Sequence, residues 1–301
     1  MTSRASASAP REAALIVNAK SRKGQKQFDE ARRLLKEKGF TLTTCKAVKD
    51  PSKLDGEVKQ AIGAGAPLVI VGGGDGSISC SVDHVVGHDT IFALLPLGTA
   101  NSFARTLGIP IDVAAAVDVI ANGVPKTIDL GMIDDDYFAN CASIGIAPLI
   151  AETVPHNLKK WFGRPGYLAW AGVRMARFKP FRLTVGEGKQ AETIEALEVR
   201  IANGAYHGGT ELVENDVDTG EIVIQAVVGG ARTKLLWSWG LSLIGPDKAR
   251  GTIREFRGRS FKLRTDPPLP ISIDGELLAT TPVTASVARR AIRIMVPAGR
   301  R

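Results

Sequence analysis

The chain has 301 residues, of which 44% are hydrophobic and 23% are charged. These values exclude collagen-like, coiled-coil and wholly disordered proteins, and at about 150 residues per domain the length predicts two folded domains. The 39 Lys and Arg residues exceed the 31 Asp and Glu residues and give a net charge of +8. This charge favours an anionic partner, which can be a nucleotide, a nucleic acid or an acidic membrane surface.

The cysteines and the apolar stretches restrict the cellular setting. Cys45, Cys80 and Cys141 lie far apart and form no CxxC pair, so neither a disulfide framework nor a cysteine-rich metal site is predicted, and a reducing cytoplasm fits. Residues 1–11 lack the apolar centre of a secretory signal and are expected to form a disordered tail. The longest apolar stretches, such as residues 235–245, reach about half a membrane span, so any membrane contact should be peripheral.

The first half of the chain alternates short apolar runs with helical patterns. Strands are expected over residues 13–18, 41–47, 68–71, 91–95 and 127–131, and helices over residues 25–38, 52–64, 77–86 and 112–121. Alternation of this kind over about 120 residues predicts a parallel sheet with helices on both faces.

After Asp129 the pattern changes to β-type runs separated by Gly, Pro and Asp turns, which predicts an antiparallel, sandwich-like β-rich domain. The runs cover residues 137–144, 182–185, 196–202, 221–228, 260–264, 271–273 and 292–296, with helical stretches over residues 157–178 and 232–243. The expected organisation is a tail of residues 1–11, an α/β nucleotide-binding domain of residues 12–131, a β-rich lipid-substrate domain of residues 132–288, and a C-terminal segment of residues 289–301. That last segment can return to the first domain, because chain termini often lie close together.

The strongest local signal is a buried strand that runs directly into residues 72–77, GGGDGS. Glycines without a Cβ atom let backbone N–H groups approach phosphate oxygens, and the helix start that follows adds the positive end of its dipole. Asp75 would repel a phosphate unless a cation lies between them, so the loop predicts a nearby Mg²⁺. An ordinary tight turn is the alternative, and neither the GxxxxGK[ST] loop nor the complete Rossmann motif occurs.

A second loop of the same form follows the strand expected over residues 91–95. Gly98 permits a close approach of the backbone, and Thr99 and Asn101 offer hydrogen bonds at a helix start. In an open α/β sheet, ligands bind beyond the carboxyl ends of the strands. We therefore expect the two loops to converge there.

Four separated motifs resemble those of the diacylglycerol kinase catalytic-domain family, whose lipid kinases include sphingosine kinases and bacterial diacylglycerol kinase-like proteins. Residues 18–24 resemble NPxSGxG, residues 73–77 resemble GGDGT, residues 96–105 resemble PxGTxNDFAR, and residues 273–276 resemble the late DGE motif. The resemblance implies ATP-dependent phosphorylation of a lipid hydroxyl, with the nucleotide in a cleft between an α/β domain and a β-rich domain.

The resemblance also implies roles for individual residues. Nucleotide contacts are expected from Asn18, Thr44, Gly73, Gly74, Asp75, Gly76, Ser77, Ser79, Gly98, Thr99 and Asn101, and metal ligation from Asp75, Asp129, Asp216 and Asp218. Glu276 is expected to accept the proton of the lipid hydroxyl, which requires a carboxylate within hydrogen-bond reach of that group. Asp274 and Gly275 just before it also form a standard hairpin turn, in which an exposed glutamate needs no catalytic role.

Four positions depart from the family pattern. Ser77 keeps the hydroxyl of the usual threonine, and Ala19 replaces a proline. Ser102 stands where relatives have an aspartate that supports a water and magnesium network. Thr219 stands at the aspartate of a pair that helps to hold a structural cation, where Asp218 can substitute.

Other candidate sites are weaker. His84 and His88 lie four residues apart, but without the glutamate of HExxH they are better explained as ordinary surface or packing histidines. Residues 156–179 join basic and aromatic side chains, which suits a membrane-surface element and equally an amphipathic helix packed on a sheet. No nucleic-acid-binding signature occurs, so no nucleic-acid partner is predicted.

The sequence therefore predicts an Mg²⁺- and ATP-dependent lipid kinase that is cytoplasmic and docks peripherally on an anionic membrane surface. Its acceptor is expected to be diacylglycerol or a similar lipid. An NAD kinase-like phosphotransferase is one alternative, since GGDG also marks that related superfamily. A catalytically weak nucleotide- or lipid-binding regulator is another, because Ser102 and Thr219 weaken the acidic sites. The identity of the lipid and the existence of a homodimer stay open.

Overall fold

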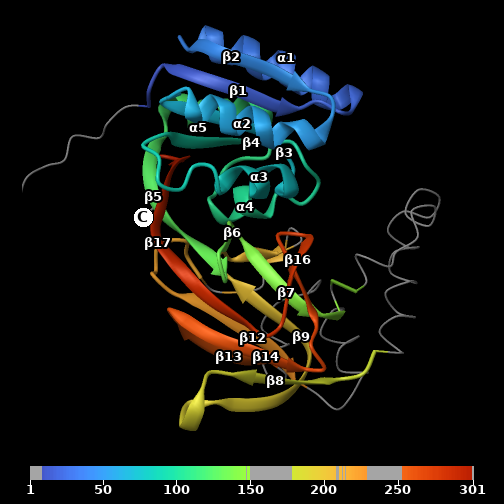
Figure 1. Cartoon of the computed structure of the whole chain (residues 1–301). Coiled ribbons are helices and arrows are strands. Elements are labelled where there is room, and N and C mark those ends of the chain that lie inside the picture. Colours follow the sequence, from blue (N-terminus) through green and yellow to red (C-terminus); the bar gives the residue numbers. More distant parts are fainter. Residues whose placement is uncertain are drawn as a thin grey trace, which may run out of the picture.

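The computed structural model of the chain describes residues 9–146, 148–149, 178–207, 210–211, 213, 215–228 and 253–299. The helix expected over residues 232–243 lies outside the described residues, and so does the one expected over residues 157–178 except for Phe178. Most of the basic and aromatic segment of residues 156–179 is therefore outside them as well. Figure 1 shows the helices gathered in one half of the molecule and antiparallel strands in the other.

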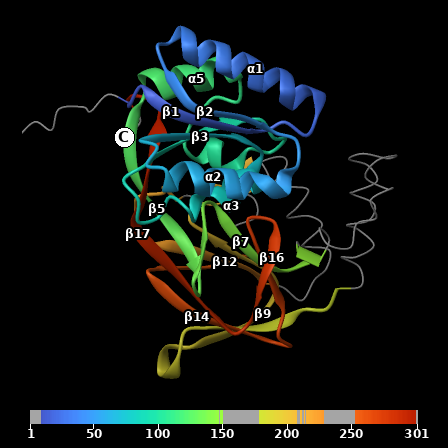
Figure 2. The same ribbon diagram turned by 45° about the horizontal axis from the view of Figure 1, so that its top comes forward.

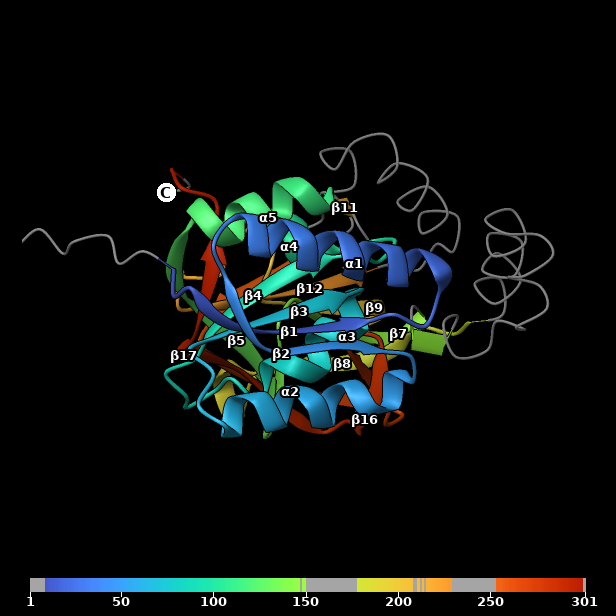
Figure 3. The same cartoon turned by 90° about the horizontal axis from the view of Figure 1, so that it is seen from above.

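The N-terminal half is a parallel sheet with helices on both faces, as predicted. Its strands are β1 (Glu12–Asn18), β2 (Thr41–Val48), β3 (Leu68–Gly73) and β4 (Ile91–Pro96), in the order β4-β3-β1-β2. The helices α1 (Arg22–Glu37) and α5 (Val113–Asn122) cover one face, and α2 (Leu54–Gly63) and α3 (Asp75–Val82) cover the other (Figures 2 and 3). The short helices of this half are η1 (Pro51–Lys53) and α4 (Ser102–Thr106). A further short helix, η2 (Gly188–Gln190), lies in the C-terminal half.

Local sequence explains why these elements form where they do. Every residue of β3 and β4 is buried, because a parallel strand between two helical layers meets no solvent. Helix α1 buries Phe28, Ala31 and Leu35 at helical spacing. Its start is capped by Ser21, whose hydroxyl accepts a hydrogen bond of 3.0 Å from the backbone N–H of Gly24.

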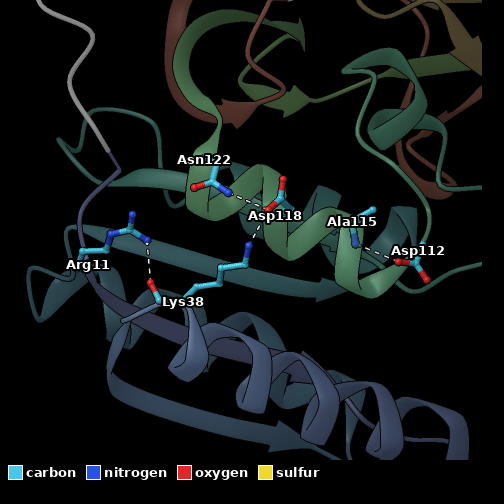
Figure 4. Close-up of polar contacts among 6 residues, drawn as sticks. All are labelled: Arg11, Lys38, Asp112, Ala115, Asp118 and Asn122. Atoms are coloured by element: carbon cyan, nitrogen blue, oxygen red, sulfur yellow. Dashed lines mark hydrogen bonds and ion pairs between the residues drawn. The ribbon is translucent and has the colours of Figure 1, made fainter.

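Polar contacts join the two helices on the same face of the sheet (Figure 4). The ammonium group of Lys38, just after α1, lies 2.8 Å from Oδ1 of Asp118 in α5, and Arg11 donates to the carbonyl of Lys38 at 3.1 Å. At the start of α5 the carboxylate of Asp112 accepts from the N–H of Ala115 at 3.0 Å. Because the ion pair is exposed, solvent screens it, and the packing of the apolar faces stabilises this layer.

The C-terminal half is antiparallel, which confirms the predicted fold class. Its strands are β6 (Asp136–Phe138), β7 (Cys141–Gly145), β8 (Phe181–Val185), β9 (Glu192–Ala202), β12 (Ile222–Val228), β13 (Ile253–Gly258), β14 (Ser260–Asp266), β15 (Pro270–Ile273) and β16 (Glu276–Thr280). The strands β10 (Tyr206–His207) and β11 (Thr210–Glu211) form a separate small sheet. No helix among the described residues is both long and apolar enough to cross a membrane.

Strand β5 (Val124–Ile133) departs from the predicted alternation. The pattern places residues 127–131 in the parallel sheet, but β5 pairs antiparallel with β17 (Val283–Val296) and Ile128 lies opposite Ile292. It is β17 that pairs in parallel with β4, so a segment from the far end of the chain takes the place expected for residues 127–131. This prediction is wrong because local periodicity does not encode which strand pairs with which. The side-by-side strands β5 and β17 run through both halves in Figure 1, and β5 crosses the predicted domain boundary at residues 131 and 132.

Gly131 in β5 lies opposite Phe138 in β6. A Cβ atom at this glycine would lie 2.0 Å from Cζ of Phe138, a ring that is fully buried. We expect Gly131→Ala to lower the free energy of unfolding by about 1–3 kcal/mol, because the buried ring has to move. Urea denaturation measures the change.

Gly56→Ala is the matched control, because nothing lies within 4 Å of its Cβ position on helix α2. Alanine there should stabilise the helix slightly. Equal stabilities of the two variants would show that the Gly131 contact does not constrain the fold.

Candidate active site

The two glycine-containing loops meet at the carboxyl ends of β3 and β4, as the sequence predicts. Gly73 lies opposite Pro96 in the sheet, and the N–H of Leu97 donates to the carbonyl of Gly73 at 2.9 Å. A Cβ atom on Gly98 would lie 2.5 Å from the Cα atom of Gly74. The two loops therefore touch backbone to backbone, and only glycine permits this approach.

Asn101 closes the second loop upon itself. Its side-chain oxygen accepts from the N–H of Gly98 at 2.8 Å, and its side-chain amide donates to the carbonyl of Gly98 at 2.9 Å. The residue is buried and adopts a left-handed conformation with φ of 48°, which asparagine tolerates better than most residues. The observed role of Asn101 is thus to shape the loop, while Thr99 is exposed on it.

The first two motifs are also joined by side chains. The amide of Asn18, at the end of β1, donates to Oγ of Ser77 at 3.2 Å. Asp75 begins helix α3, and its Oδ1 accepts from the N–H of Phe103 in α4 at 3.3 Å. The first backbone N–H groups of an α-helix have no partner within the helix, and at the start of α3 no side chain caps them. Such a start is suited to bind an anion.

The DGE motif lies against this helix from the other half of the molecule. Asp274 and Gly275 form the β15–β16 turn with φ of 45° and 104°. Oδ2 of Asp274 accepts from the hydroxyl of Ser79 in α3 at 2.8 Å and from the N–H of Ala139 at 2.9 Å, and Oδ1 accepts from the N–H of Cys141 at 3.1 Å. Burial raises the pKa of Asp274 above its ordinary value, against the opposing effect of these hydrogen bonds.

Two neighbouring pockets flank this turn, and Asp274 lines both. The first is lined by Asp55, Gly76, Ser79, Cys80, Asp83, His84, Asp136, Tyr137, Ile273, Asp274, Glu276 and Leu278. The second is lined by Asp75, Ile78, Ser102, Phe103, Ala139, Asn140, Asp274 and Gly275. The structure thus brings Glu276 into one pocket with Gly76 and Ser79, and puts Asp75 in the adjoining one.

The first pocket contains acidic residues that sequence reasoning missed. Asp55 in α2, Asp83 after α3 and Asp136 in β6 line it together with Glu276. Although Asp83 as a residue is exposed, loss of water around its carboxyl group raises its pKa to about 6, helped by the nearby acids and opposed by His84. Nε2 of His84 lies 2.6 Å from Oδ1 of Asp55, so this histidine is a hydrogen-bond partner of Asp55 in the pocket wall.

Thr44 is not brought together with the other predicted nucleotide contacts. It lies within strand β2, opposite Ala14, whereas the glycine loops begin where β3 and β4 end. Strand β2 is the edge strand of the parallel sheet, and its carboxyl end is at Val48, four residues after Thr44. The position of Thr44 gives no support to a nucleotide contact.

The acids predicted to ligate metal belong to two expected sites, a magnesium network with Asp75 and Asp129 and a structural cation with Asp216 and Asp218. The buried Asp129 accepts from the N–H of Gly220 and from the N–H of Arg290, both at 2.7 Å. Among the residues that the structure describes, no group of three or more His, Cys, Asp or Glu side chains could hold a metal ion. Asp75 alone still fits an Mg²⁺ ion that arrives on a nucleotide, because such an ion takes most of its ligands from phosphates and water.

The residues around Asp218 do not fit a structural cation. Nζ of Lys126 lies 2.8 Å from Oδ2 of Asp218, so an ammonium group already neutralises this carboxylate. The hydroxyl of Thr219 donates to Oδ1 of Asn215 and to the carbonyl of Glu221, each at 3.3 Å. The carboxylate of Asp218 and the hydroxyl of Thr219 thus have partners within the chain, while Asp216, the other acid expected there, accepts from the N–H of Val217 at 2.8 Å.

This geometry predicts that the nucleotide-free protein gains no stability from divalent cations. Its thermal unfolding midpoint should be the same in Mg²⁺ and in EDTA. The substitution Lys126→Met should lower the free energy of unfolding by up to about 1 kcal/mol, because it removes the ammonium group beside Asp218. Differential scanning calorimetry measures both. A marked rise of the wild-type midpoint in Mg²⁺ would contradict the absence of a structural cation.

Two family models match the chain. Residues 12–133 match the diacylglycerol kinase catalytic domain, and residues 140–296 match the YegS C-terminal NAD kinase beta sandwich-like domain. A solved structure from Bacillus anthracis str. Sterne, described as a diacylglycerol kinase, has the same fold with a TM-score of 0.77 and 23% identity, covering 95% of this chain and 97% of that one.

Three curated proteins are similar to the chain in sequence. The chain is 30% identical to a "Probable lipid kinase YegS-like" of Pseudomonas putida over 80% of this chain and 81% of that protein. It is 27% identical to a diacylglycerol kinase of Mycobacterium tuberculosis over 79% of each. It is also 28% identical to the uncharacterized protein sll0036 of Synechocystis, of which it spans 57%. The chain therefore belongs to the diacylglycerol kinase catalytic-domain family, a family of lipid kinases.

Proposed function

We propose that the chain transfers the γ-phosphate of ATP to a hydroxyl group of diacylglycerol or a similar lipid at an anionic membrane surface. The observation that carries the proposal is that Glu276 lines one pocket with Gly76 and Ser79, next to the pocket of Asp75. Membership of the family supports a kinase with a lipid acceptor. The net charge of +8 supports an anionic surface as the place of action.

The nucleotide phosphates are proposed to bind at the touching loops. The backbone at Gly74 and Gly98 has no side chain to keep a phosphate away, and the first turn of α3 offers N–H donors. Asp75 and the hydroxyl of Ser77 lie at the same helix start. When bound with the nucleotide, Mg²⁺ would be held by Asp75 and would neutralise charge on the phosphate oxygens.

Glu276 is proposed as the general base. Its carboxylate takes the proton of the lipid hydroxyl as that oxygen forms a bond to the γ-phosphorus, while the bond from this phosphorus to the β-phosphate oxygen breaks and ADP leaves. Asp274 holds the turn that carries Glu276, through the hydrogen bonds from Ser79 and Ala139. The base is therefore fixed relative to the helix that begins at the glycine loop.

An NAD kinase-like activity is the second candidate, because the C-terminal family model describes an NAD kinase-like β-sandwich.

One assay separates the two candidates. Labelled ATP and Mg²⁺ are incubated with the protein and with vesicles of diacylglycerol, ceramide or a sphingoid base, or with NAD. We expect label in a lipid product. Transfer to NAD alone would support the second candidate, and nucleotide binding without any transfer would indicate a regulator.

The role of Glu276 is tested by Glu276→Gln, which keeps the size of the side chain but removes its basicity. We expect kcat for lipid phosphorylation to fall by about 100- to 10,000-fold with an unchanged Kd for ATP, because a general base contributes to the chemical step. Lipid transfer and nucleotide titration measure the two quantities.

Glu37→Gln, on the exposed surface of α1, is the matched control and should keep the wild-type rate. If Glu276→Gln also turned over at the wild-type rate, Glu276 would not be the base.

A further inference from the structure

Exposed apolar side chains are concentrated next to the proposed base. Among the described residues, the large hydrophobic side chains that are exposed are Ile111, Leu277 and Leu278, with exposed fractions of 38%, 42% and 56%. Leu277 and Leu278 follow Glu276 directly in strand β16. Single exposed apolar residues are common on protein surfaces, but two adjacent ones beside a candidate active site call for an apolar partner.

Strand β16 is an edge of the sheet. It ends the strand order of the large sheet and pairs with β15 alone among the described strands (Figure 1). Soluble proteins often protect such edges with charged side chains or proline, because an apolar edge promotes unwanted association. Here the exposed positions after Glu276 are leucines, so this edge is suited to meet an apolar surface.

A β-bulge directs one of the leucines into the pocket. Leu277 lies opposite Ser272 and Ala279 lies opposite Ile271, so Leu278 is an extra residue with no opposite partner. A bulge at a sheet edge changes the direction of a side chain, and bulges are frequent next to active sites. Leu278 lines the same pocket as Glu276.

The pocket is therefore lined by two chemically different groups of side chains. Its carboxylates, those of Glu276, Asp55, Asp83 and Asp136, suit a hydroxyl-bearing headgroup without negative charge. Leu278 provides an apolar wall beside Glu276, and Leu277 continues the apolar surface along the exposed strand. An alcohol whose hydroxyl is attached to a long apolar chain matches this arrangement of charge and apolar surface.

We propose that Leu277 and Leu278 form the contact surface for the apolar chain of the acceptor lipid, so that the chain lies over β16 while its hydroxyl faces Glu276. This inference rests on the proposed function. A second copy of the protein paired along β16 would cover the pocket that Glu276 lines and would obstruct an acceptor. The lipid is therefore the occupant that agrees with the position of these leucines.

The test compares Leu278→Asn with Ile111→Asn, an equally drastic change at an exposed position that does not line the pocket. The substrate is long-chain diacylglycerol in phosphatidylcholine vesicles. Leu278→Asn should raise the KM for this lipid about tenfold, the contribution expected of one buried leucine, and leave the KM for ATP unchanged. Ile111→Asn should leave both values unchanged, and Leu278→Met should restore the wild-type KM.

A second measurement separates this inference from the proposed function. Co-sedimentation with the same vesicles should be weakened by Leu278→Asn and by Leu277→Asn, and not by Ile111→Asn, whether or not phosphate is transferred. Unchanged lipid KM and unchanged sedimentation in both leucine variants would overturn the inference while leaving a lipid kinase intact.

A wild-type dimer that Leu278→Asn converts to a monomer, measured by light scattering, would also overturn it, because the occupant would then be a second copy. Wild-type protein without transfer to any lipid would refute the proposed function and with it the assignment of these leucines to an acceptor, and the sedimentation result would then report only whether they contact a lipid surface.

Discussion

The partly buried carboxylate of Asp274 is the interaction on which the candidate site depends. It accepts hydrogen bonds from Ser79 in the helix after the glycine loop and from the backbone at Ala139 and Cys141 in the antiparallel half. A buried carboxylate is costly unless such donors surround it, so the three segments are held in one arrangement. Glu276 follows two positions later in the chain, and its place in the pocket is a consequence of this arrangement.

The approach of two loops is the second constraint. Gly74 and Gly98 contact each other through their backbones, and this brings helix starts from two neighbouring strands to one edge of the sheet. Asn101 holds the second loop with hydrogen bonds to Gly98. The proposed phosphate site would therefore be built mainly from backbone groups that the fold positions.

The two halves of the molecule are connected by strand pairing, hydrogen bonds and an ion pair. Strand β17 pairs with β14 and with β4, so one continuous sheet crosses the molecule. Asp129, in β5, accepts from the backbone of Gly220 and of Arg290, and Lys126 in the same strand neutralises Asp218. Each buried or partly buried acid here has a partner from another segment, which fixes β5 against the antiparallel half.

The features that the sequence predicts are those that depend on residues close together in the chain. The strands β1 to β4, the helices α1, α2 and α5, the glycine loops and the DGE turn follow from local periodicity and from glycine, because these depend on neighbours within a few positions. Strands β13 and β16 were not expected from the sequence. Tertiary structure alone decided that β17 replaces β5 beside β4, that Asp55, Asp83 and Asp136 share a pocket with Glu276, and that Thr44 lies away from the loops. Those outcomes depend on strand pairing and on packing between distant segments, whose free energy leaves no periodic trace in the sequence.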